Sequence, residues 1–185
     1  MNRKTKKFTT RKLTTMGMLC ALAYAAVSFG RIPLILFLKY DPKDVIIAIG
    51  GLIYGPLVSF GISLIVSAVE MLTIIGTGVW GMVMNVISSC AFTCPAAFIY
   101  RKRRSLLGAV IGLLGGWGTM VLVMMLWNYL IAPIYMGYPR EAVLPLLASA
   151  FLPFNLIKGG LNTVLIMLLY KPVVTALRRA SLVDW

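Results

Sequence analysis

The chain has 185 residues, of which 60% are apolar and only 12% are charged. A soluble domain carries about 25% charged residues, so this composition excludes a water-soluble globule and leaves room for about six membrane spans of roughly 20 residues each. The net charge of +13 does not indicate a nucleic-acid partner, because thirteen of the eighteen basic residues lie in clusters at 3–12, 101–104 and 171–179, each beside an apolar segment. Such clusters mark the cytoplasmic border of spans and contact lipid headgroups.

The first predicted span covers residues 13–30 and follows a basic segment at 1–12. A basic start before an apolar run also resembles a signal peptide, but this run is long enough to span, so we expect an uncleaved helix. Residues 31–44 follow, apolar in the middle and interrupted by Pro33 and Pro42. An apolar loop of this length is unusual for a simple connector, which suggests that it covers part of the outer side of the molecule.

Four helices are predicted next in the chain. The helix at 43–54 is short for a full span, and a Gly-Pro turn after it begins the helix at 56–73. A glycine-rich outer loop at 74–80 leads into the helix at 79–100, and the helix at 106–131 follows a basic turn. These segments alternate between the two sides of a membrane.

A polar, proline-containing outer loop at about 135–141 precedes the last predicted helix at 148–170. An even number of spans places both terminal basic clusters on one side, in agreement with the positive-inside rule. The sequence therefore predicts an all-α membrane protein with six transmembrane helices and both termini in the cytoplasm. The six-helix domain would cover 13–171, between the N-terminal segment 1–12 and a C-terminal tail at 172–185.

Small residues recur at four-residue spacing in two of these helices. Gly108, Gly112 and Gly116 form one ladder, and Ala21 and Ala25 form another. Small side chains at this spacing permit close approach of two helices. For the alanines, the contact is either internal packing or a partner's helix.

Polar side chains inside the spans are the functional candidates, because they are costly there. Lys158 lies within the last span, and Asn155 lies three residues before it on the same helix face. Asn128 and Asn85 add amides from two further helices. One ammonium and several amides suit a neutral or weakly acidic ligand with carbonyls and ring nitrogens, because an amide both donates and accepts.

Each candidate also has a purely structural interpretation. An asparagine in a bundle often bonds a neighbouring helix, contributing about 1 kcal/mol, and Lys158 can extend to the outer headgroups. The aromatic side chains of the outer half fit an interfacial belt. Trp127 and Phe154, however, adjoin the polar candidates and are suited to stack on a planar ligand.

An enzymatic role lacks support in the sequence. The chain has five acidic residues and no histidine, so options for a general base are poor. It has no phosphate-binding loop, so active transport would need a partner that hydrolyses ATP. Cys20, Cys90 and Cys94 lie in apolar segments, and we expect neither a disulfide, a metal site nor a cofactor.

Five segments, in order and covering nearly the whole chain, resemble the substrate-binding (S) component of energy-coupling factor (ECF) vitamin transporters, most closely the riboflavin-specific members. They are 38–44, 50–56, 77–85, 128–135 and 153–159. The last, Pro-Phe-Asn-Leu-Ile-Lys-Gly, is the most specific. The resemblance implies the six-helix S-component fold in a prokaryotic cytoplasmic membrane, with an outward-facing vitamin pocket.

The resemblance also implies roles for individual residues. The implied substrate-binding set is Asn128, Asn155, Lys158, Asn85, Leu38, Lys39, Tyr40 and Asp41. The first three would hydrogen-bond the isoalloxazine ring of riboflavin, and Asn85 would line the pocket. The loop around 38–44, here named the gate loop, would gate the pocket and supply the others. Ala21 and Ala25 would dock on the transmembrane coupling subunit, and two ATP-binding subunits would drive toppling of the S component in the membrane.

Two positions depart from the expected family pattern. After the gate loop the family reads Asp-Pro-Ser-Asp-Ile-Pro, whereas residues 41–46 read Asp-Pro-Lys-Asp-Val-Ile, and the third helix has Val69-Glu70 in place of Lys-Asn. Both changes lie at the outer rim, so they concern the ligand more than the fold. The alternatives are an S component for another vitamin or flavin, a solute transporter that works alone, and an intramembrane enzyme or structural helper.

Overall fold

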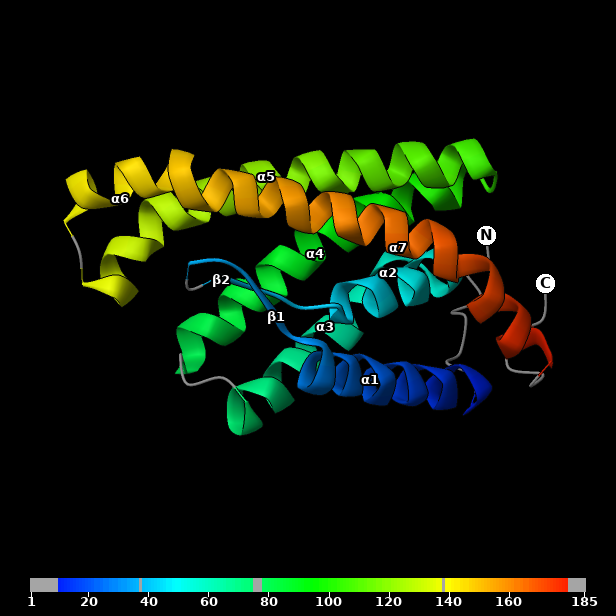
Figure 1. Ribbon diagram of the computed structural model, residues 1–185. Coiled ribbons are helices and arrows are strands. Elements are labelled where there is room, and N and C mark those ends of the chain that lie inside the picture. Colours follow the sequence, from blue (N-terminus) through cyan, green and yellow to red (C-terminus); the bar gives the residue numbers. More distant parts are fainter. Residues whose placement is uncertain (1–9, 37, 75–77, 138, 180–185) are drawn as a thin grey trace, which may run out of the picture.

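Long helices make up most of the molecule, with one short hairpin between the first two (Figure 1). The computed structural model describes residues 10–36, 38–74, 78–137 and 139–179. The elements in chain order are α1 (Thr10–Gly30), β1 (Ile32–Ile35), β2 (Leu38–Tyr40), α2 (Lys43–Tyr54), α3 (Pro56–Thr73), α4 (Gly78–Lys102), α5 (Leu106–Met136), α6 (Arg140–Leu146), the π-helical turn η1 (Leu147–Phe151) and α7 (Leu152–Arg179).

Five helical segments are long and apolar enough to cross a membrane. They are Lys12–Gly30, Pro56–Thr73, Gly78–Lys102, Leu106–Ile134 and Arg140–Ala176. The sixth helix, α2, has 12 residues and a length of about 18 Å, little more than half of a hydrocarbon core of about 30 Å. The predicted helical membrane protein is confirmed, and so are the predicted bounds of α2 and α3.

The last helical stretch consists of α6, η1 and α7 in succession, from Arg140 to Arg179, so it begins earlier and ends later than the predicted helix at 148–170. The outer loop predicted at about 135–141 is shorter than expected. Helix α5 ends before Gly137, whose φ is 69°, and α6 begins at Arg140 after Pro139. A proline at the N-cap does not interrupt a helix, since the first N–H groups have no partner there. Pro145 lies just before the π-helical turn, and such turns absorb the irregularity that an internal proline causes.

The segment after α1 forms an antiparallel hairpin, residues 31–41, where a loop was expected. Ile32 pairs with Tyr40, and a bulge shifts the register farther along. The base is closed by Arg31, whose Nε lies 2.6 Å and whose Nη2 lies 3.2 Å from the two carboxylate oxygens of Asp41. The hairpin occupies the half of the bundle that the short α2 does not reach (Figure 1).

Helices α4 and α5 pack closely along part of the glycine ladder. A Cβ on Gly112 would lie 2.7 Å from the Ala96 carbonyl oxygen, and one on Gly116 would lie 2.1 Å from the Phe92 oxygen. The predicted close approach is therefore confirmed at these two glycines. Gly108 serves instead the α4–α5 turn, because its Cβ would meet the Arg103 carbonyl oxygen at 1.9 Å.

Both ends of the helical bundle can be recognised in Figure 1. The first turn of α1, the last turn of α7 and the α4–α5 turn lie at one end. The hairpin and the α5–α6 turn lie toward the other. This places the basic residues of the α4–α5 turn at the same end as both terminal helix ends.

Candidate functional site

Three polar side chains line one face of α7. Asn155, Lys158 and Asn162 follow one another at three- and four-residue steps, and they are 2%, 5% and 0% exposed. The ammonium of Lys158 lies 2.9 Å from Oδ2 of Asp44 in α2. Lys158 is thus an inward-facing charge, and the interpretation that it extends to the headgroups is wrong.

Asp44 is the centre of a contact between three helices. It lies in the first turn of α2, where the helix dipole favours a negative charge, and is fully buried. Ser89 of α4 donates a hydrogen bond to its Oδ1, while Lys158 of α7 neutralises its charge and donates to Ser88 Oγ at 3.2 Å. The carboxylate and the ammonium therefore fix each other's position.

A second buried ion pair joins α2 to α3. Lys43 Nζ lies 2.5 Å from Glu70 Oε2, and both side chains are 0% exposed. Asn85 of α4 donates to the same oxygen at 3.5 Å, and Asp41 Oδ2 lies 4.0 Å from the ammonium. Asn85 therefore makes the hydrogen bond to a neighbouring helix that was considered above as the structural alternative to a pocket role.

These groups form one neutral set, here named the polar cluster. Its members are Arg31, Lys43 and Lys158 as cations and Asp41, Asp44 and Glu70 as anions. Buried charges persist only when they are paired, and three of the chain's five acidic residues are used here. A ligand beside Lys158 therefore needs no negative charge of its own.

The hairpin reaches this cluster through Asp41 and Tyr40. Burial alone would lower the pKa of Arg31, but its hydrogen bond to Asp41 and that carboxylate's charge raise it overall. Burial, with the charges of Asp44 and Asp41, raises the pKa of Tyr40, so its hydroxyl is protonated at neutral pH. It donates to Asn162 Oδ1 at 2.8 Å.

The remaining predicted residues divide between the cluster and its surroundings. Asn128 and Asn155 are each 2% exposed, and each donates from Nδ2 to the carbonyl four residues earlier at 2.7 Å. Leu38 packs beside the apolar contact of α5, α6 and η1, whereas Lys39 is exposed. Asn128 and Leu38 thus mark the α5 side of the candidate site, and Lys39 is outside it.

The alanine pair lies on the outside of α1. Ala21 is exposed and Ala25 is half-buried, while the buried face of the helix carries Leu19, Ala23 and Val27. Internal packing does not account for Ala21. The surface is accessible to another helix.

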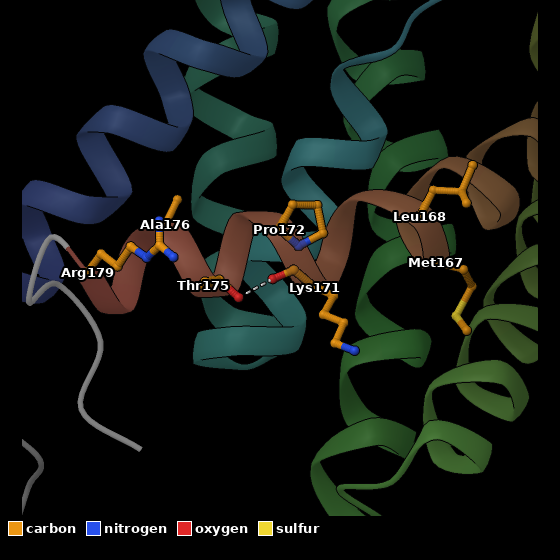
Figure 2. Close-up of a pocket in the computed structure, with 7 residues that line it drawn as sticks. All are labelled: Met167, Leu168, Lys171, Pro172, Thr175, Ala176 and Arg179. Atoms are coloured by element: carbon orange, nitrogen blue, oxygen red, sulfur yellow. Dashed lines mark hydrogen bonds between the residues drawn. The ribbon is translucent and has the colours of Figure 1, made fainter.

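A separate groove of about 670 Å³ lies along the last part of α7. Its lining residues, drawn in Figure 2, are Met167, Leu168, Lys171, Pro172, Thr175, Ala176 and Arg179. Lys171 is 13 residues beyond Lys158, or about 20 Å along the helix. The groove is therefore distinct from the polar cluster, and none of the predicted site residues lines it.

Several residues of the polar cluster, and several that contact it, were not predicted from the sequence as site residues. Asp44 belongs to the predicted gate segment and Glu70 to a noted departure, but neither was assigned as the partner of a lysine. Asn162 had a usable signal, because it follows Lys158 by four residues on the same face. Ser88 and Ser89 had none, since serine is common in membrane helices.

Comparison with known proteins gives a consistent result. Residues 11–170 match the family described as the ECF transporter substrate-specific component. The riboflavin transporter FmnP of Bacillus subtilis (strain 168) is 32% identical, covering 93% of this chain and 98% of its own. The riboflavin transporter RibU of Staphylococcus aureus (strain TCH60) is 26% identical, covering 91% and 93%. A solved structure, described as the S component of a bacterial ECF transporter, matches with a TM-score of 0.77 at 27% identity over 90% of this chain and 97% of that one.

Proposed function

The chain belongs to the family of ECF transporter substrate-specific components, and on this basis we propose that it captures riboflavin outside the cell and delivers it across the cytoplasmic membrane of a prokaryote. It is a transport subunit rather than an enzyme. Two relatives that match nearly the whole chain are named as riboflavin transporters, which supports the ligand. The observation that carries the proposal is the buried Lys158 beside Asn155, already balanced by Asp44.

The chemistry of the cluster suits riboflavin. An ammonium has three N–H donors, and in the described part of the chain that of Lys158 lies near two oxygens, Asp44 Oδ2 at 2.9 Å and Ser88 Oγ at 3.2 Å. The third donor is left for a carbonyl or ring nitrogen of the isoalloxazine. Asn128 and Asn155 supply the amides that match its remaining edge, and Trp127 next to Asn128 supplies an aromatic face.

Charge balance argues for the uncharged vitamin over its phosphate. The six ionised side chains of the polar cluster sum to zero. Moving an additional anion into such a site costs desolvation, and each cation of the polar cluster is already paired with a carboxylate. We therefore propose that riboflavin binds more tightly than FMN.

The topology follows from the positive-inside rule. We propose six spans with both termini in the cytoplasm, α2 being the short one. The proposal is supported by Arg101–Arg104, at the end of α4 and in the turn after it, because this turn lies at the same end of the bundle as the first turn of α1 and the last turn of α7 (Figure 1). The hairpin then faces outward, where the vitamin enters.

Energy for transport would come from partners. We propose that a transmembrane coupling subunit docks on α1 at Ala21 and Ala25, and that two ATP-binding subunits act through it. The exposure of Ala21 supports this docking face, because a small exposed side chain lets a partner's helix approach closely.

A two-part experiment tests the proposal. A panel of riboflavin, FMN, thiamine and biotin is titrated into the purified protein, and riboflavin should raise the unfolding temperature most. Liposomes that contain the protein with its coupling and ATP-binding subunits should then take up riboflavin only with ATP. Ala21→Leu should abolish uptake and leave binding unchanged. Stabilisation by thiamine or biotin, with none by riboflavin, would overturn the ligand and leave the transport role in place.

A further inference from the structure

Asn162 lies at the deep end of the polar face of α7. It follows Lys158 by four residues and Asn155 by seven, so the three side chains form a row about 10 Å long. It is 0% exposed, and its Oδ1 accepts the hydrogen bond from Tyr40 at 2.8 Å. The residue thus connects the face that carries Lys158 to the hairpin.

The amide of Asn162 is only half satisfied. Its Nδ2 is buried and has no hydrogen-bond partner among the described residues. A buried donor without a partner is destabilising by about as much as a lost hydrogen bond, and folded proteins seldom leave one. An acceptor from outside the chain is therefore expected at this position.

Tyr40 determines which end of the amide is open. Its hydroxyl donates to Oδ1, which leaves Nδ2 as the unused group of the amide among the described residues. An unused donor, one helical turn deeper than the Lys158 ammonium, is placed to reach an atom that Lys158 does not contact.

We infer that Asn162 is a further ligand-binding residue, whose Nδ2 donates a hydrogen bond to a carbonyl or hydroxyl oxygen of the bound vitamin, and that Tyr40 is the positioning residue for this amide. The inference rests on the proposed function. It extends the binding face of α7 from two residues to three and matches an elongated ligand better than a small ion.

Stopped-flow quenching of riboflavin fluorescence tests this inference. Asn162→Leu keeps the approximate size and removes the amide, so the dissociation rate constant should rise about 10-fold or more, with the association rate constant within about twofold. The matched control is Thr163→Val on the same helix, because within the described part of the chain the Thr163 hydroxyl bonds only the Gly159 carbonyl, at 2.8 Å. Thr163→Val should change neither rate constant by more than about twofold.

A second variant, Tyr40→Phe, distinguishes a direct contact between Asn162 and the ligand from an effect of Asn162 on the hairpin. In Tyr40→Phe protein, Asn162→Leu should still raise the dissociation rate constant several-fold, though less than in the wild-type background, because the amide can still donate to the ligand but is no longer held by Tyr40. No further effect in the Tyr40→Phe background would overturn the inference, since Asn162 would then act only through Tyr40. If Asn162→Leu lowers the yield of folded protein, Asn162→Ser replaces it, with the same expected direction.

The wild-type protein and the Asn162 variants together distinguish failure of the proposed function from failure of the role of Asn162. A wild-type protein that does not quench riboflavin contradicts the proposed function itself. Normal quenching by the wild type, together with unchanged rate constants in both Asn162 variants, contradicts only the role of Asn162; a bound water at Nδ2 would give that second result.

Discussion

Two regions hold this bundle together by different means. Along the α4–α5 seam, Gly112 and Gly116 bring two backbones into contact, against the carbonyl groups of Ala96 and Phe92. In the polar cluster, α2 meets α3, α4 and α7 through paired charges and hydroxyl groups. The seam is held by backbone packing, whereas the cluster presents the polar groups that, in the proposed function, would meet a ligand. Substitutions in the seam should therefore change stability alone, whereas substitutions in the cluster should also change ligand affinity.

Breaking the Asp44–Lys158 pair should produce the largest effect. Lys158→Met leaves a buried carboxylate without a cation, which is expected to cost about 3–5 kcal/mol in the free energy of unfolding. Adding Asp44→Asn removes that charge while the side chain can still accept from Ser89, so stability should largely return. Riboflavin affinity should stay at least about 10-fold weaker in both variants. Thermal unfolding and fluorescence titration give the two readings; full affinity in the double variant would show that Lys158 only balances Asp44.

The second ion pair sharpens the comparison within the cluster. Lys43→Met should destabilise the protein by about 3 kcal/mol, at the lower end of the range for a broken buried pair, because Asn85 still contacts Glu70. Adding Glu70→Gln should recover most of this loss. Riboflavin affinity in the double variant should stay within about threefold of the wild type, because this pair joins α2 to α3 and not to the binding face of α7.

If the Lys43→Met/Glu70→Gln and Lys158→Met/Asp44→Asn variants lost riboflavin affinity equally, the two ion pairs would not differ in their roles. The cluster would then act as one unit. Thermal unfolding of all variants in one detergent measures the change in stability for both ion pairs.

The seam should respond to volume and not to charge. Gly116→Ala places a methyl group against the Phe92 backbone and should cost about 1–3 kcal/mol. Gly118→Ala is the matched control, because a Cβ there would meet nothing within 4 Å. It should be neutral or stabilise by up to about 1 kcal/mol. Similar unfolding temperatures for the two variants would mean that the seam is not close-packed.

Hydropathy predicted the helices that lipid requires, because a span must be long and apolar whatever its tertiary contacts. It failed where proline was interpreted as a break. Pro139 precedes a helix and Pro145 is absorbed by a π-helical turn, so α6, η1 and α7 run together. The hairpin was also missed, since four- and three-residue strands carry little pattern.

Of the candidate site, the sequence predicted the residues of α7 but not their partner in α2. The Asn155–Lys158 face follows from helical spacing, but Asp44 is far from Lys158 in sequence, and no local pattern reveals such a pairing. The two departures from the family pattern, at Lys43 and Glu70, were treated as separate changes. The structure makes them one ion pair of 2.5 Å, so each explains the other.

The most direct measurement of the central claim is a riboflavin fluorescence titration of the wild type and Lys158→Ala, side by side. The wild type should quench one equivalent of riboflavin with high affinity. Lys158→Ala should bind at least about 10-fold more weakly, because an acceptor on the buried ligand loses its partner. Absence of quenching by the wild type, or equal affinity in the two proteins, would contradict the account.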